Sequence, residues 1–129
     1  MSVVLSYHGK PESDAALQLA IRAAKQRGTD LTIVVASRMS ADDERTEMDA
    51  HDRLWTALES CGVPFQVRNA SGNEPVAETL LDVAGEINAA LIVLGLRRGG
   101  YGSVNLGVNA SRVLLDAPCP VLTTTEFER

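Results

Sequence analysis

The stretch Leu91-Ile92-Val93-Leu94-Gly95-Leu96-Arg97-Arg98-Gly99-Gly100 joins an apolar strand to a segment rich in glycine and arginine. A helical pattern from about Leu106 to Asp116 follows, and then a second apolar strand that begins at Val121. Glycine lets the backbone approach a ligand closely, and the free N–H groups at a helix start attract anions. The stretch therefore predicts a strand, a phosphate-binding loop and a helix.

Strand and helix patterns alternate along the whole chain. The predicted strands are Val3–Tyr7, Leu31–Ala36, Phe65–Arg68, Ala90–Leu94 and Val121–Thr124, and the predicted helices are 12–27, about 40–60, 75–87 and about 106–116. Five strands joined by four helical crossovers indicate an α/β fold, with a parallel sheet and helices on both faces. We expect a single doubly wound domain over residues 1–129.

The expected ligand site follows from this architecture. Open parallel sheets bind ligands beyond the carboxyl ends of their strands, at the point where the strand order reverses. The segments 7–11, after the first strand, and 95–106, after the fourth, both lie at that end.

Composition excludes several classes of function. The formal net charge of −5 argues against nucleic-acid binding, which depends on basic side chains. Residues 92–122 nevertheless carry three arginines and one aspartate, which favours a small anion. No apolar run reaches the roughly 20 residues of a membrane span, and no signal sequence is recognised, so we expect a cytoplasmic protein with no membrane partner. The two cysteines, Cys61 and Cys119, lie in no metal or redox motif.

Three segments of the chain carry a resemblance to a known family. They are the opening strand, loop and helix over Val4–Leu17, the second strand over Gly28–Val35, and the stretch Leu91–Leu122. Together they resemble the universal stress proteins over nearly the whole chain. The resemblance implies a sheet of order 3-2-1-4-5 and a homodimer. In one branch of the family it also implies ATP or AMP bound between the first and fourth strands.

The motif of the nucleotide-binding branch is only partly present. Gly95 matches its first glycine, but Arg98 stands where the second is expected, and the loop up to Gly107 is one residue short. Val108 replaces a hydroxyl residue, and His8 stands where an aspartate is typical. Valine has no side-chain donor for a phosphate oxygen. These departures favour weak or no adenine-nucleotide binding.

Candidate contacts with a nucleotide or another small anion are the two loop arginines, backbone amides of the loop and of the next helix start, and the ends of the first two strands. These candidates are Tyr7, His8, Val35, Gly95, Arg97, Arg98, Gly99, Gly100, Gly107, Val108 and Asn109. Arginine offers charge-assisted, bidentate contacts to phosphate. We find no catalytic arrangement and no metal-ligand set.

Two main functions remain open on this basis, and a third, weaker one is an enzyme that uses the same cleft to act on a small phosphorylated substrate. The first is a non-enzymatic, cytoplasmic stress-response homodimer with weak or no nucleotide binding. The second is an ATP- or AMP-binding stress protein, with or without slow ATP hydrolysis. In either case we expect the homodimer to form through the edge strand at residues 119–124, because its uncharged backbone edge invites pairing with a second copy.

Overall fold

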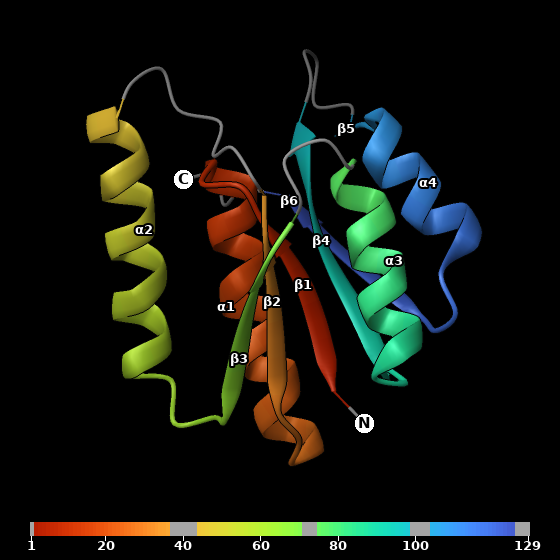
Figure 1. The fold of residues 1–129 in the computed structure, drawn as a ribbon, viewed down its shortest axis with the longest axis horizontal. Coiled ribbons are helices and arrows are strands. Elements are labelled where there is room, and N and C mark those ends of the chain that lie inside the picture. The colour runs from red at the N-terminus through yellow and green to blue at the C-terminus, as the bar shows by residue number, and fades with distance from the viewer. Residues whose placement is uncertain (1, 37–43, 71–74, 99–103, 126–129) are drawn as a thin grey trace.

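The computed structural model describes residues 2–36, 44–70, 75–98 and 104–125 of the chain. Its elements alternate between strand and helix over most of this length (Figure 1). In chain order they are β1 (Val3–Tyr7), α1 (Pro11–Arg27), β2 (Leu31–Val35), α2 (Glu44–Glu59), β3 (Phe65–Asn69), α3 (Val76–Glu86), β4 (Leu91–Arg98), β5 (Val104–Asn105), α4 (Val108–Asp116) and β6 (Val121–Thr125).

Five parallel strands form the sheet in the order β3-β2-β1-β4-β6. Numbered among the parallel strands alone, this is the expected order 3-2-1-4-5, so the predicted fold class is confirmed. β5 is an additional short strand, antiparallel to the end of β4. The order in which strands are added reverses between β1 and β4. From β1 the chain adds β2 and β3 on one side, and from β4 it adds β6 on the other.

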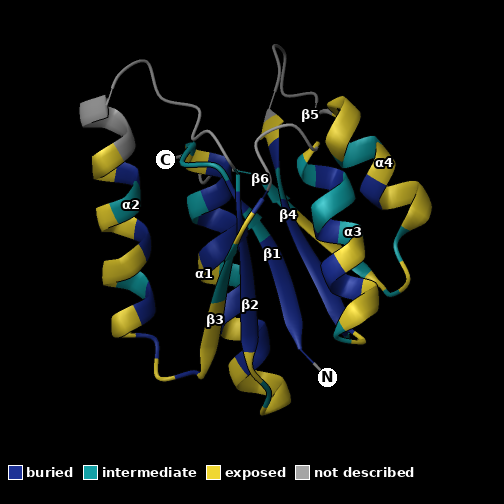
Figure 2. Cartoon of the chain, viewed as in Figure 1, coloured by how far each residue is buried: buried dark blue, intermediate teal, exposed yellow. Residues whose placement is uncertain are grey.

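The helices cover both faces of the sheet, so that the molecule has two apolar cores (Figure 2). Alternate residues of β1 divide between them, as the period of a strand requires. Val3, Leu5 and Tyr7 belong to the core beneath α1 and α2. Val4 belongs to the core beneath α3 and α4. The central strands are therefore apolar on both sides, as expected for a parallel sheet covered by helices.

The prediction that the fourth strand ends at Leu94 is wrong, as is the prediction of a loop over all of 95–106. β4 continues to Arg98 because later segments of the chain pair with its end: Leu96 pairs with Thr125 of β6, and Arg98 pairs with Val104 of β5. Gly95 is therefore a strand residue. A Cβ at this position would overlap the carbonyl oxygen of Glu12, so the glycine admits the first turn of α1 against the strand.

Helix ends follow the sequence signals closely. Gly28 ends α1 in the left-handed region, with φ of 64°, as the predicted stop required. Pro75 precedes α3 as its N-cap residue, one position earlier than expected. α4 begins at Val108, two residues later than predicted. Within the described ranges, no helix combines the length and the apolar character needed to cross a bilayer.

Candidate functional site

A cleft opens where β1 and β4 separate at the carboxyl edge of the sheet. The two strands pair only up to Leu5 and Val93. Beyond that point β1 continues in register with β2 as far as Tyr7, and β4 continues with β6 as far as Leu96. The gap lies at the reversal of strand order, where doubly wound folds bind ligands.

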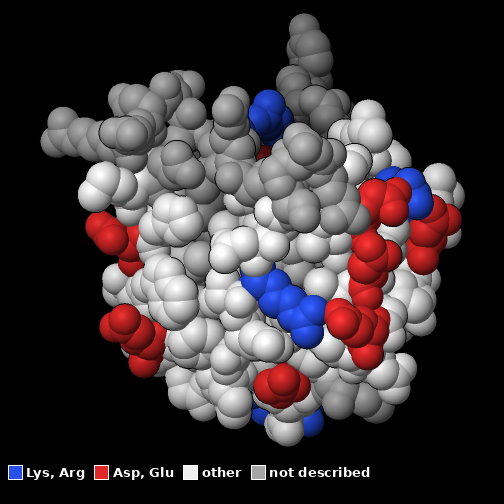
Figure 3. Space-filling model, viewed as in Figure 1, with Lys and Arg blue, Asp and Glu red and all other residues white. Residues whose placement is uncertain are grey.

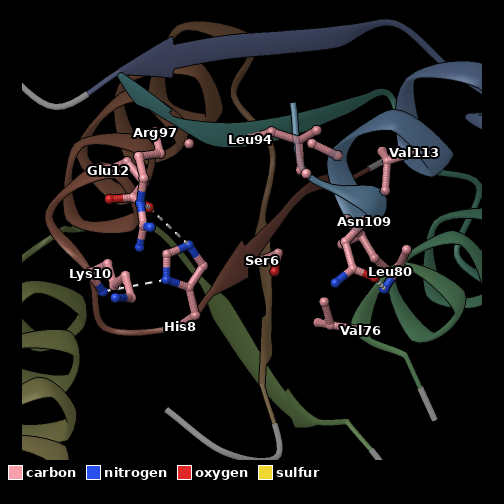
Figure 4. Close-up of a pocket in the computed structure, with 14 residues that line it drawn as sticks. Ser6, His8, Lys10, Glu12, Val76, Leu80, Leu94, Arg97, Asn109 and Val113 are labelled. Atoms are coloured by element: carbon pink, nitrogen blue, oxygen red, sulfur yellow. Dashed lines mark hydrogen bonds and ion pairs between the residues drawn. The ribbon is translucent and has the colours of Figure 1, made fainter. Parts of the chain in front are cut away.

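The cleft holds a cavity of about 380 Å³ with two different walls (Figure 4). On one side His8, Lys10, Glu12 and Arg97 gather at the ends of β1 and β4 and at the start of α1. On the other side apolar side chains of β4, α3 and α4 face the space, with Ser6 between the two walls. The complete lining is Ser6, His8, Lys10, Glu12, Val76, Ala77, Leu80, Leu94, Gly95, Arg97, Gly107, Asn109, Ala110 and Val113.

Glu12 is the central charge of the polar wall. Its side chain is only 9% exposed, and its Oε2 atom lies 3.9 Å from both His8 Nε2 and Arg97 Nε. Arg97 is 58% exposed. A carboxylate this buried is costly without cations nearby, and Arg97 supplies one. With Lys10 on the same wall, the polar side carries a net positive charge even when His8 is neutral.

His8 is held as a neutral imidazole in this setting. The backbone N–H of Lys10 donates to His8 Nδ1 at 3.4 Å, so the ring proton of the neutral form lies on Nε2, toward Glu12. Burial lowers the pKa of His8 below its usual value. The negative charge of Glu12 opposes this shift, whereas the positive charges of Lys10 and Arg97 add to it.

The N-termini of α3 and α4 meet at the opposite side of the cavity. Asn109, in the first turn of α4, accepts a hydrogen bond from the backbone N–H of Ala77 through Oδ1 at 3.3 Å. One turn further along, Arg112 forms an ion pair with Glu78 at 2.5 Å. These contacts fix two helix starts beside one hollow, where the positive ends of the helix dipoles favour a negatively charged ligand.

A half-exposed network behind the polar wall ties the β1–α1 segment to α2. The hydroxyl of Tyr7 donates to Asp14 Oδ1 at 2.6 Å. Arg53 of α2 lies 3.3 Å from Asp14 Oδ2 and donates to the Gly9 carbonyl at 2.9 Å. Burial raises the pKa of Tyr7 above its usual value, and the hydrogen bond to Asp14 adds to this. The segment carrying His8 and Lys10 is thus braced from the far side.

The structure brings five of the predicted site residues to the cavity: His8, Gly95, Arg97, Gly107 and Asn109. Arg98 lies at the end of β4, and Gly99 and Gly100 fall outside the described residues.

Three predicted contacts are absent from the lining of the cavity. Tyr7 and Val35 are buried in the core beneath α1 and α2, because their odd positions along the strands point them to the other face of the sheet. Val108 is 89% exposed on the outside of α4. Its side chain therefore faces away from the cavity, and contact through its backbone N–H stays a prediction.

The sequence reasoning missed the acidic member of the site. Glu12 lies in the first turn of α1, where acidic residues are common because they suit the helix dipole, yet it follows His8 by four residues and lies 3.9 Å from its ring on the same wall. The i, i+4 spacing was the available signal. Ala77 and Leu80 of the apolar wall also belong to the core beneath α3 and α4, and Val76 packs against it, so hydrophobic spacing alone does not mark them as ligand contacts.

Charges elsewhere are mixed. On the face shown in Figure 3, basic side chains form small groups among acidic ones. Within the described ranges, no cluster of three or more histidine, cysteine or acidic residues could hold a metal ion.

Comparison with known proteins agrees with the fold. The sequence model of the universal stress protein family matches residues 1–124. A universal stress protein of Mycolicibacterium smegmatis is 33% identical over an alignment 129 positions long, which covers 93% of this chain and 94% of that protein. Three further mycobacterial relatives are longer, and the chain spans about half of their length, 48% in each.

Solved structures show the same architecture. A universal stress protein in complex with cAMP has a TM-score of 0.69 and 23% identity, with 98% of each chain covered. The universal stress protein of Archaeoglobus fulgidus in complex with dAMP has a TM-score of 0.68 and 21% identity, covering 95% of this chain and 96% of that one.

Proposed function

Because this chain belongs to the universal stress protein family, we propose that its cleft binds a small adenine mononucleotide weakly and without catalysis. The observation that carries the proposal is the open cavity between β1 and β4. One wall of it is cationic and the other is apolar. Such a pair of walls matches a ligand with a flat apolar base at one end and an anionic phosphate at the other.

Size favours a mononucleotide over a triphosphate. The cavity of about 380 Å³ lies near the lower end of the range of about 300–1,000 Å³ that is typical of ligand pockets. Two structural relatives of low sequence identity are named as complexes with cAMP and with dAMP, which are both mononucleotides.

Weak affinity follows from the side chains available. Val108, which follows the helix N-cap Gly107, points outward and has no hydroxyl to offer a phosphate. Glu12 places a carboxylate in the same wall as the cations and partly cancels their attraction for an anion. We expect a dissociation constant on the order of 0.1 mM.

A non-catalytic role fits the arrangement of Ser6 and His8. Both line the cavity, but in the described part of the chain no hydrogen bond joins them, and His8 Nδ1 already accepts from the Lys10 amide. A serine nucleophile needs a base within hydrogen-bond reach to activate it. ATP hydrolysis remains the alternative that the experiment below tests.

The proposal includes a homodimer in the cytoplasm. β6 is an edge strand without charged residues, paired with β4 in the described structure, and its Leu122 is 39% exposed. Backbone pairing across a twofold axis would satisfy the outer edge of this strand. Cys61 and Cys119 are both free thiols, which is typical of a reducing compartment.

Calorimetric titration with AMP, cAMP and Mg-ATP tests the proposed function. We expect binding heat for the two monophosphates, with weaker binding of ATP and no release of inorganic phosphate from it. Arg97→Gln should weaken monophosphate binding, because it removes a cation from the polar wall. The exposed Arg22→Gln on α1 is the matched control and should bind as the wild type does. No heat with either monophosphate would refute the proposal, and steady phosphate release would establish an ATPase instead.

A further inference from the structure

We propose that the cleft binds its anionic ligand together with a proton, which is taken up by His8. The inference rests on the proposed nucleotide function and adds its regulation: affinity rises as the pH falls. It is carried by the placement of His8 between a backbone donor and a buried carboxylate, on the wall of the cavity (Figure 4).

The first step is the state of the ring before a ligand binds. His8 is 29% exposed, and its Nδ1 accepts from the Lys10 N–H. If Nδ1 carried a proton, two N–H donors would point at each other, so the charged imidazole cannot keep this hydrogen bond. The cations Lys10 and Arg97 disfavour the charged ring further, and burial does so most of all. In the free protein His8 is therefore neutral near pH 7.

The second step is the effect of an anion. The charged groups that face His8 are Lys10 from its own segment, Glu12 from α1 and Arg97 from β4. Of these three charged groups, only Glu12 favours the imidazolium, at 3.9 Å from Nε2. A phosphate in the same cavity adds one or two further negative charges, which raises the pKa of His8 in the complex above its value in the free protein.

The third step is geometric. When Nδ1 gains its proton, the Lys10 N–H is released from the ring. Two donors, the Lys10 amide and the Nδ1–H group, then become available at the polar wall. An oxyanion accepts from both, so protonation creates the donor pair that the ligand needs. The ligand and the proton thus bind cooperatively, and each strengthens the binding of the other.

The sign of the pH dependence follows from linkage. Because the pKa of His8 is higher in the complex than in the free protein, affinity is greatest below the free-protein pKa. It falls as the pH rises through the pKa of the complex. The free value lies below the ordinary pKa of about 6.5. We expect cAMP to bind about three- to tenfold more tightly at about pH 5.5 than at about pH 8.

The choice of cAMP removes an ambiguity. The second ionisation of a phosphate monoester such as AMP has a pKa of about 6 and would itself create a pH dependence. The phosphodiester of cAMP keeps one charge over the whole range. Calorimetry at about pH 6.5 in two buffers of different ionisation enthalpy should show net uptake of a fraction of a proton per cAMP bound.

Variants of the two histidines test whether His8 is the residue that takes up the proton. His8→Gln should lose the pH dependence of cAMP binding, whereas the matched control His51→Gln on α2 should keep it. An NMR titration of the His8 ring in the wild-type protein, free and saturated with cAMP, should show a higher pKa in the complex. This measurement needs no folded variant.

The outcomes separate the two proposals. Binding of cAMP that does not change with pH, or an unchanged His8 pKa on saturation, overturns the proton-coupled inference and leaves the nucleotide function standing. A pH dependence that survives in His8→Gln also overturns it. Absence of cAMP binding at every pH overturns the proposed function, and the inference falls with it.

Discussion

Gly95 is needed for packing, although the glycine- and arginine-rich sequence around it suggests contact with a ligand. It lines the cavity, yet a side chain on it would overlap the backbone of Glu12. The absence of a Cβ therefore brings α1 against β4 and sets Glu12 beside Arg97. The polar wall depends on this contact.

Gly95→Ala should destabilise the fold by about 1–3 kcal/mol, because the nearest atoms belong to the backbone and cannot move aside as a flexible side chain would. The free energy of unfolding from urea titration is the measurement. Gly85→Ala in α3 is the control: among the described residues, nothing outside the helix backbone comes within 4 Å of a Cβ at this position, so the change should stabilise the protein by about 0.5–1 kcal/mol. Equal stability of the two variants would contradict this account.

Helices and strands could be predicted from the sequence where hydrophobic patterns and capping residues within the segment itself determine the structure. The apolar runs of β1 and β2 and the Gly28 stop of α1 all appear as expected. The extent of β4 was not predictable, because Gly95 and the arginines after it resemble a turn. The pairing partners that keep them extended, Thr124 and Asn105, lie far along the chain or form a strand of two residues.

The candidate site was predictable in position and only partly in composition. Topology alone placed His8 and Gly107 at one end of the sheet. The side on which a strand residue points depends on register, and this is why Tyr7 and Val35 were assigned to the cavity although they face the other core. The contact of Glu12 with Arg97 joins elements far apart in the sequence, beyond the reach of any local pattern.

The brace between α2 and the β1–α1 segment makes a prediction at this scale. Arg53→Met removes the donor to the Gly9 carbonyl and the partner of Asp14. Backbone amides of residues 8–10 should then exchange hydrogen faster, and cAMP should bind about two- to fivefold more weakly. Hydrogen exchange by mass spectrometry and calorimetry are the measurements. The exposed Arg22→Met serves as the control, and unchanged exchange in Arg53→Met would show that the brace does not hold the segment.

For the molecule as a whole, the parallel sheet leaves β6 at its border, next to β4. The strand Val121–Thr125 contains only apolar and threonine side chains. Edge strands in monomers usually carry a charge or a proline that discourages pairing. The lack of either in β6 is the physical basis of the proposed homodimer.

Leu122→Lys should convert the proposed dimer into a monomer, because a lysine on the strand opposes edge pairing. Light scattering after size-exclusion chromatography gives the mass directly, and circular dichroism checks that the fold is retained. Met48→Lys on α2 is the matched control: Met48 is 66% exposed, and its substitution should leave the mass unchanged. A Leu122→Lys protein of unaltered dimer mass would exclude β6 as the interface.

The close seating of α1 on β4 at Gly95 also bears on the kinetics of association. Since no side chain separates the helix from the strand, the start of α1 has little freedom to shift before a ligand arrives. A site whose wall is already ordered loses less conformational entropy when the ligand binds than a flexible site does. We therefore expect different ligands to bind with similar association rate constants, and their affinities to differ mainly through their dissociation rate constants.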